Sequence, residues 1–163
     1  MNDSASNRKA ELRDFVAARH AQSWPILETL TKEDRDKVVY ATDDHPWTVQ
    51  SVVSHLADAE SGMLGQARRA SQGKMTVPDD FDLERWNRGV ARKSESNTID
   101  GFRDQILKTH MEILDFLDGL DDPILEIKGR HASGDILSIE DFLRRIASHR
   151  LEHAQDIQEA LHE

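Results

Sequence analysis

Three histidines are the residues of this chain whose type and spacing are best suited to chemistry. His149 and His153 lie four residues apart in a segment with helical periodicity. Their side chains therefore point in directions only about 40° apart, one turn from each other, and two such imidazoles can reach one metal ion. Histidine pairs at this spacing also arise by chance, so the pair alone is consistent with either a metal site or two core histidines.

His55 supplies a third candidate ligand from a different predicted helix. It lies three residues after Val52 and four before Ala59, which places it on the inward edge of that helix. Three neutral imidazoles with one open position suit Zn²⁺, Ni²⁺ or Fe²⁺, whereas Mg²⁺ and Ca²⁺ prefer oxygen ligands. Such an ion lowers the pKa of bound water toward about 7, polarises an oxygen, or activates a thiol. A core histidine bonded to a backbone carbonyl is the alternative interpretation of His55.

The segment HRLEH, which contains both C-terminal histidines, also matches the inverted zinc-peptidase pattern. Glu152 would then be the general base. Those peptidases take a third, acidic ligand from much further along the chain, and only ten residues follow His153. We therefore expect Glu152 to be a surface carboxylate or a neighbour of the site.

Other side chains have weaker claims to the site. His110 falls on an inward helical position, where a core or rim role is favoured. A fourth ligand such as Glu60 or His110 would indicate a closed structural metal site. Trp86 and Asn87 either line a pocket mouth or close one end of the fold. The further histidines have weaker claims still: His20, His45, His131 and His162.

Four segments with helical periodicity must position these side chains. The first covers residues 6–30, and the second runs from an N-cap at Thr48 to about Gln72. The third covers residues 99–117 and has the most regular apolar spacing. The fourth begins at Ser138, where the sequence resembles a capping box.

The connectors between these segments constrain the fold. Asp43, Asp44 and Pro46 predict a turn before the second helix, and residues 38–40 are too short to argue for a sheet. The connector between the second and third helices has roughly 25 residues, at up to about 3.3 Å each, so it can cross the whole molecule. We therefore expect an all-α, up-down-down-up four-helix bundle in which residues 1–163 form one domain. In that order His55 faces the other two histidines.

Composition excludes several classes of function. The net charge of −10 and the pI near 5.2 disfavour binding to nucleic acid or anionic lipid. The chain contains no cysteine, so a thiolate ligand, a cysteine nucleophile and a disulfide are excluded. No apolar run is long enough for a signal peptide or a membrane span. We therefore expect a cytoplasmic protein.

Three segments together resemble the DinB-like superfamily of small four-helix proteins: HPWTVQSVVSHLADAE, FDLERWN and SIEDFLRRIASHRLEHAQDI. The most specific features are Trp47 shortly before His55 and the paired histidines of the last helix. The resemblance implies nickel or zinc on His55, His149 and His153, and often a homodimer. It also implies a thiol-dependent enzyme, because relatives include mycothiol-dependent maleylpyruvate isomerase and bacillithiol transferases.

Two hypotheses from different classes follow. The preferred one is a metal-dependent enzyme acting on a small molecule, either an S-transferase or isomerase that uses a low-molecular-weight thiol, or a hydrolase. The competing one is a non-catalytic dimeric bundle with a stress-response or interaction role, holding a structural metal or none. The superfamily's name does not imply DNA repair, since the chain lacks polymerase motifs.

Overall fold

The computed structural model describes residues 3–42 and 45–163, so Asp43 and Asp44 of the predicted turn lie outside the described residues. Helices dominate the described chain. They are α1 (Asp3–Glu28), α2 (Val49–Ser71), α3 (Leu83–Arg92), α4 (Ile99–Asp118) and α5 (Ile139–Leu161), with short 3₁₀ segments at Lys32–Asp34, Ser94–Ser96 and Asp122–Glu126.

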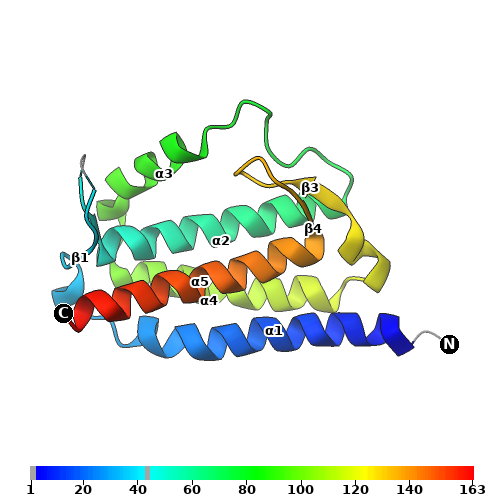
Figure 1. The fold of residues 1–163 in the computed structure, drawn as a ribbon, viewed down its shortest axis with the longest axis horizontal. Helices are drawn as coiled ribbons and strands as arrows, with labels where there is room; N and C mark the ends of the chain where they lie inside the picture. The colour runs from blue at the N-terminus through cyan, green and yellow to red at the C-terminus, as the bar shows by residue number, and fades with distance from the viewer. Residues whose placement is uncertain (1–2, 43–44) are drawn as a thin grey trace.

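The four long helices pack side by side as the predicted four-helix bundle (Figure 1). In Figure 1, α1 and α5 run in one direction while α2 and α4 run in the other. The helices are therefore arranged up, down, down and up. Because α2 and α4 are parallel, the connector 72–98 must return along the length of the bundle. Within this connector Trp86 lies on the ten-residue helix α3.

Side-chain caps fix where the two histidine-bearing helices begin. The Thr48 hydroxyl accepts a hydrogen bond from the Ser51 N–H at 3.2 Å. The Ser138 hydroxyl accepts one from the Asp141 N–H at 3.0 Å. Each bond satisfies one of the donors that a helix start leaves without an intrahelical partner. The predicted starts of both helices are confirmed.

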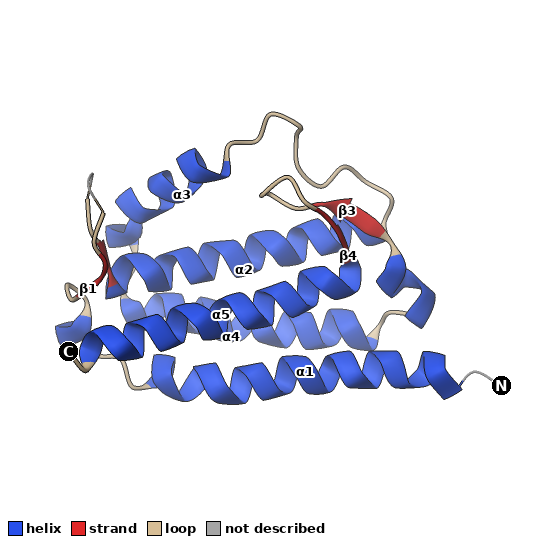
Figure 2. Cartoon of the chain, in the orientation of Figure 1, coloured by secondary structure: helices blue, strands red, loops and turns tan. Residues whose placement is uncertain are grey.

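Two short antiparallel hairpins, which the sequence did not predict, lie at opposite ends of the bundle (Figure 2). In the first, β1 (Val38–Tyr40) pairs with β2 (Trp47–Thr48); in the second, β3 (Lys128–Arg130) pairs with β4 (Ile136–Ser138). Strands of two or three residues suffice here because each hairpin packs on the bundle. Since β2 leads directly into α2 and β4 into α5, each hairpin anchors the start of a histidine-bearing helix.

The core consists of two apolar clusters. One includes Leu64, Ile113 and Phe142, and the other includes Leu56, Ile106 and Ile157. Polar side chains that are buried or half-buried lie near the middle of each long helix, where the two clusters meet: His20 and Ser23 of α1, His55 and Glu60 of α2, Thr109 and His110 of α4, and His149, Arg150 and His153 of α5. We call this set the polar layer. It crosses the middle of the bundle.

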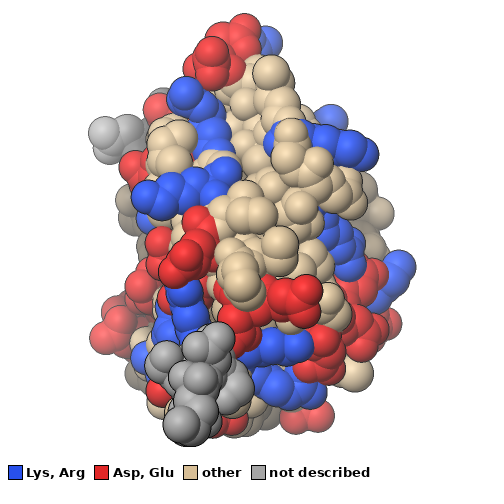
Figure 3. All heavy atoms as spheres, turned by 90° about the vertical axis from the view of Figure 1, so that its right-hand side faces the viewer, with Lys and Arg blue, Asp and Glu red and all other residues tan. Residues whose placement is uncertain are grey.

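The surface carries both signs of charge. Figure 3 shows acidic and basic side chains interspersed over one end of the bundle, with uncharged residues between them. None of the helices in the described ranges combines the length and the apolar character needed to cross a membrane.

Candidate metal centre

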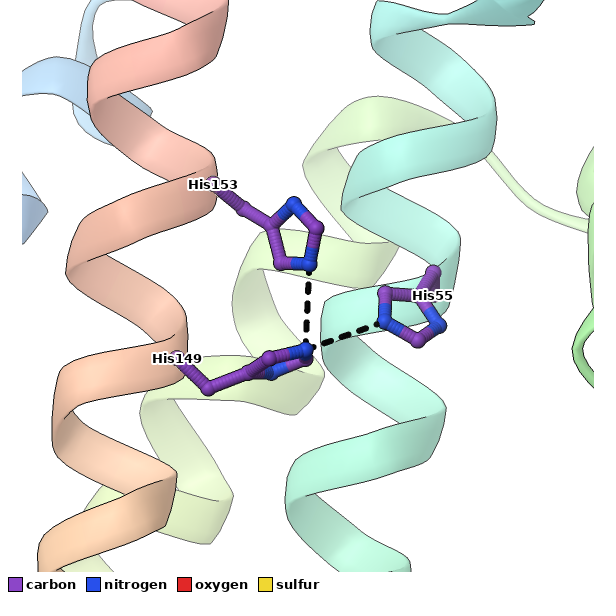
Figure 4. A group of neighbouring side chains, drawn as sticks. All are labelled: His55, His149 and His153. Atoms are coloured by element: carbon purple, nitrogen blue, oxygen red, sulfur yellow. Dashed lines mark hydrogen bonds between the residues drawn. The ribbon is translucent and has the colours of Figure 1, made fainter. Parts of the chain in front are cut away.

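The structure brings His55, His149 and His153 together between α2 and α5 (Figure 4). The Nε2 atom of His149 lies 3.2 Å from that of His55 and 3.0 Å from that of His153. One nitrogen from each ring lies within 4.8 Å of the others. All three rings therefore turn the same type of atom toward one point.

The fold explains this convergence. His55 lies two turns after the α2 start and is 7% exposed, whereas His149 and His153 are half-buried on successive turns of α5. Because α2 and α5 are antiparallel neighbours, the early part of α2 faces the later part of α5. Trp47, in the strand before α2, packs edge-on against His55 with ring centroids 5.5 Å apart.

Burial keeps these imidazoles neutral. Desolvation lowers the pKa of His55 to about 4 and that of His149 to about 3, and the neighbouring His153 adds to both shifts. The pKa of His153 is also lowered by burial, against the opposing charges of Asp156 and Glu152. Near neutral pH each ring therefore retains a lone pair, as a metal ligand must.

A hydrogen-bond chain orients His153. The Tyr40 hydroxyl lies 2.7 Å from Nδ1 of His153 and donates to a carboxylate oxygen of Asp156. Since the single hydroxyl proton goes to Asp156, the Tyr40 oxygen accepts from Nδ1–H of His153. The lone pair of His153 is then on Nε2, the atom that faces the other two histidines. Outer partners of this kind fix the tautomer of metal-binding histidines.

The donor set fits a nitrogen-liganded transition metal. It consists of neutral imidazoles only, and within residues 3–42 and 45–163 no carboxylate joins the group. Nδ1 of His55 and Nδ1 of His149 have no hydrogen-bond partner among the described residues. Zn²⁺, Ni²⁺ and Fe²⁺ suit such ligands, and three protein ligands leave a coordination position open for chemistry.

The residues considered as a fourth ligand have other partners. Glu60 is fully buried and its Oε1 accepts from Nε of Arg150, which is 2% exposed. The same guanidinium lies 2.7 Å from Nδ1 of His20 through its Nη1. His110 stacks on His20 with ring centroids 3.7 Å apart. These side chains also belong to the polar layer, while Glu152 is exposed.

A cavity of about 570 Å³ opens beside the histidines and is bordered by His55 and His149. One face of α2 forms its floor, and residues of the connector 72–98, the β3–β4 hairpin and α5 form much of the remaining wall. Trp86 and Asn87 line it, as one interpretation of the sequence proposed. The Trp86 indole N–H donates to Asp58 at 2.8 Å. A second cavity of about 680 Å³ shares Trp86 as a wall but contains none of the three histidines, so the first is the relevant one.

Sequence reasoning missed several residues around the centre. Asp156 follows His153 by three residues, and Arg145 precedes His149 by four, so helical spacing could have placed both on the same face. Tyr40 carried no comparable local signal, because the β1–β2 hairpin brings it there.

The whole-chain comparisons agree with this architecture. The family model described as the DinB superfamily matches residues 14–157. No curated protein matches the chain.

Three solved structures share the fold at low sequence identity. YfiT from Bacillus subtilis, described as a probable metal-dependent hydrolase with an unusual four-helix bundle topology, has a TM-score of 0.76 and 19% identity over 99% of this chain and 90% of its own. An uncharacterised protein from Escherichia coli UTI89 has a TM-score of 0.72 and 15% identity, covering 93% and 91%. The colibactin self-resistance protein ClbS, solved with double-stranded DNA, has a TM-score of 0.75 and 12% identity, covering 95% and 96%.

Proposed function

Because the chain belongs to the DinB superfamily, we propose that it is a metal-dependent enzyme acting on a small molecule. His55, His149 and His153 bind the divalent ion, and the substrate occupies the adjacent cavity. One observation carries this proposal: three neutral imidazoles converge through their Nε2 atoms at the edge of a cavity of about 570 Å³. A closed structural site would not need that opening.

The chain's own residues prepare the site for chemistry. A bound divalent ion supplies Lewis acidity, which polarises an oxygen or favours the deprotonated form of water or a thiol. Burial keeps the ligands unprotonated, and Tyr40 with Asp156 holds His153 in the ligating tautomer. The indole of Trp86, which donates a hydrogen bond to Asp58, forms part of the cavity wall.

Two reaction classes share this centre. Hydrolysis is supported by the description of YfiT, a protein with the same fold. Thiol-dependent transfer or isomerisation is supported by the resemblance of the histidine-bearing segments to thiol-using relatives. Since the chain has no cysteine, the second class requires a low-molecular-weight thiol as cosubstrate.

The remaining parts of the proposal concern the metal and the state of the protein. We propose nickel or zinc, with iron as the third choice, because all donors are imidazole nitrogens. We also propose a cytoplasmic homodimer in which residues 1–163 act as one domain. The net charge of −10 supports the absence of nucleic-acid binding, although ClbS was solved with DNA.

Elemental analysis of protein purified without an affinity tag tests the metal centre. The wild type should contain close to one transition-metal ion per chain, and the H149A variant should lose it. The matched control is H162A, because His162 is an exposed histidine at the end of the same helix. Retention of the full metal content by H149A would show that the proposed ligand set is wrong.

Activity assays then separate the enzyme from the non-catalytic bundle. The metal-loaded protein is screened against ester and amide substrates, and against electrophilic substrates with and without added thiols. Turnover that requires both the metal and His149 supports the enzyme. A protein whose only response to chelation is a lower melting temperature would instead hold a structural metal, as the competing hypothesis states.

A further inference from the structure

The cavity beside the histidines has hydrogen-bond donors at some distance from them. Arg145 precedes His149 by four residues and lines the same cavity, together with His131 of the β3–β4 hairpin and Gln66 of α2. One helical turn, about 6 Å along α5, separates Arg145 from His149. We call Arg145, His131 and Gln66 the donor cluster.

His131 contributes a donor of defined tautomer. Its Nδ1 accepts a hydrogen bond from the Ser133 N–H at 2.9 Å, so its proton is on Nε2. The side chain is buried, with 8% exposure, and burial lowers its pKa. No described residue pairs with the Nε2–H group. The Nε2 atom is accessible to solvent, so this donor is open to the cavity that His131 lines and can bind a ligand there.

Gln66 adds a buried carboxamide to the wall of the same cavity. It is 8% exposed, and its Oε1 has no hydrogen-bond partner among the described residues. It stands on the same face of α2 as His55, three turns further along, and lines the cavity. Oε1 is an acceptor, so a carboxylate can be bound only through the two N–H donors on Nε2 of the same side chain.

Arg145 supplies the charge. Its hydrogen bonds within the described chain both involve Nη1, at 3.3 Å to an Asp135 carboxylate oxygen and at 3.5 Å to Nδ1 of His131. Asp135 is a largely exposed partner, with 62% side-chain exposure, so this ion pair is weak and solvent-screened. A guanidinium has five N–H donors, and those on Nε and Nη2 can bind a carboxylate as a fork.

The charge in the cavity contrasts with that of the whole chain. The chain has a net charge of −10, yet Arg69 and Arg145 both line this cavity. Asp58 is the carboxylate in the described lining, and it already accepts from Trp86. The two arginines give the cavity a positive electrostatic potential, which favours a negatively charged ligand.

Two glycines leave room for the ligand. Gly62 and Gly65 lie in the interior of α2 and line the cavity, although glycine is disfavoured in helices. A Cβ atom at either position would meet nothing within 4 Å, so helix packing does not require glycine there. Because glycine has no side chain, these two positions leave the space above the α2 backbone open.

We propose that this cavity binds a carboxylate group of a small organic acid. Arg145 pairs with the carboxylate, His131 Nε2–H and the Gln66 amide complete its hydrogen bonds, and the rest of the molecule extends toward the three histidines. The inference rests on the proposed function, because it names the substrate class of the same site. The carboxylate itself is bound about one helical turn from the metal ligands and does not depend on the metal.

Calorimetric titration with glutarate, a short dicarboxylate, tests this proposal on the metal-free and the zinc-loaded protein. Glutarate should bind the wild type in both states, and the neutral diamide of glutarate should not bind. R145Q should weaken glutarate binding by about tenfold or more, since hydrogen bonds to charged groups are involved. R144Q is the matched control, because Arg144 is the neighbouring arginine, pairs with Glu140 and is absent from the cavity lining.

Each outcome decides the inference. Equal glutarate affinity in R145Q and R144Q would overturn it, and so would binding of the diamide or tighter binding of inorganic phosphate. If R145Q does not fold, R145K replaces it and should weaken glutarate binding without abolishing it. G62L should block the cavity without touching Arg145. A wild type that binds glutarate but no metal would refute the proposed metal enzyme and leave this carboxylate site standing.

Discussion

Replacing Tyr40 by Phe should weaken metal binding without removing any ligand. The hydroxyl of Tyr40 connects Nδ1 of His153, at 2.7 Å, to the carboxylate of Asp156. Y40F keeps the ring that packs edge-on against His153, with centroids 5.8 Å apart, and deletes only this connection. His153 would then be free to place its proton on Nε2, the atom that must remain unprotonated to bind a metal.

The expected magnitude follows from the two hydrogen bonds that are lost. A hydrogen bond to a charged group contributes about 1.5–3 kcal/mol, and both Tyr40 and Asp156 are half-buried, so solvent reduces this value. Loss of an outer partner of a metal-binding histidine typically lowers metal affinity about 10–100-fold, or about 1.4–2.7 kcal/mol. The metal-free protein should lose only about 1–2 kcal/mol, or roughly 3–6 °C in melting temperature.

Competition with a chromogenic chelator at pH 7.5 measures the zinc affinity of the variants. H153A sets the value for a lost ligand, and D156N tests the chain itself. An Asn oxygen still accepts from Tyr40 but carries no charge, so D156N should fall between the wild type and Y40F. Urea titration of the metal-free forms measures the change in unfolding free energy, which must be subtracted from the change in zinc-binding free energy.

Two results would contradict this account. If Y40F binds zinc as tightly as the wild type while H153A does not, the hydroxyl has no role in holding the ligating tautomer. If Y40F loses as much affinity as H153A, the hairpin that carries Tyr40 has moved and the effect is not local.

Three further predictions concern stability. Metal-free protein should lose stability as the pH falls from about 6.5 toward 4, because the folded-state pKa values of His55 and His149, about 4 and about 3, lie below the unfolded value of about 6.5. Equal urea midpoints at pH 7.5 and pH 5 would contradict this sign. G62A should raise the unfolding free energy by about 0.5–1 kcal/mol in urea titrations, because a Cβ there meets nothing within 4 Å; destabilisation would mean that the floor of the cavity is filled. R150M should destabilise by about 3 kcal/mol, because it leaves Glu60 buried without its partner. The double variant E60L/R150M should recover that loss in thermal melts, and a cost equal to that of R150M would refute this interpretation of the pair.

The helices were predictable because their signals are local. Thr48 and Ser138 cap α2 and α5 where the sequence placed them. The spacing of His149 and His153 needed only the period of one helix. The relation of His55 to them required the topology as well, and the length of the connector supplied it.

The hairpins and the environment of the centre were not predictable in the same way. Residues 38–40 are too few to show a period, and their partner strand lies across a turn. Tyr40 reaches His153 over 113 positions of sequence, and the Glu60–Arg150 pair spans 90. Such contacts depend on how two elements pack, which no single segment encodes.

The parallel course of α2 and α4 separates the histidine cluster from much of the wall of the cavity beside it. The three histidines of the candidate metal centre lie on two helices that the apolar clusters and the Glu60–Arg150 pair hold together. Much of the cavity's roof belongs to the connector 72–98, whose contacts with the bundle include the bond between Trp86 and Asp58. Changes in the length or composition of that connector would reshape the cavity and leave the three histidines in place. A bundle with this topology can change what its cavity binds without moving the three histidines.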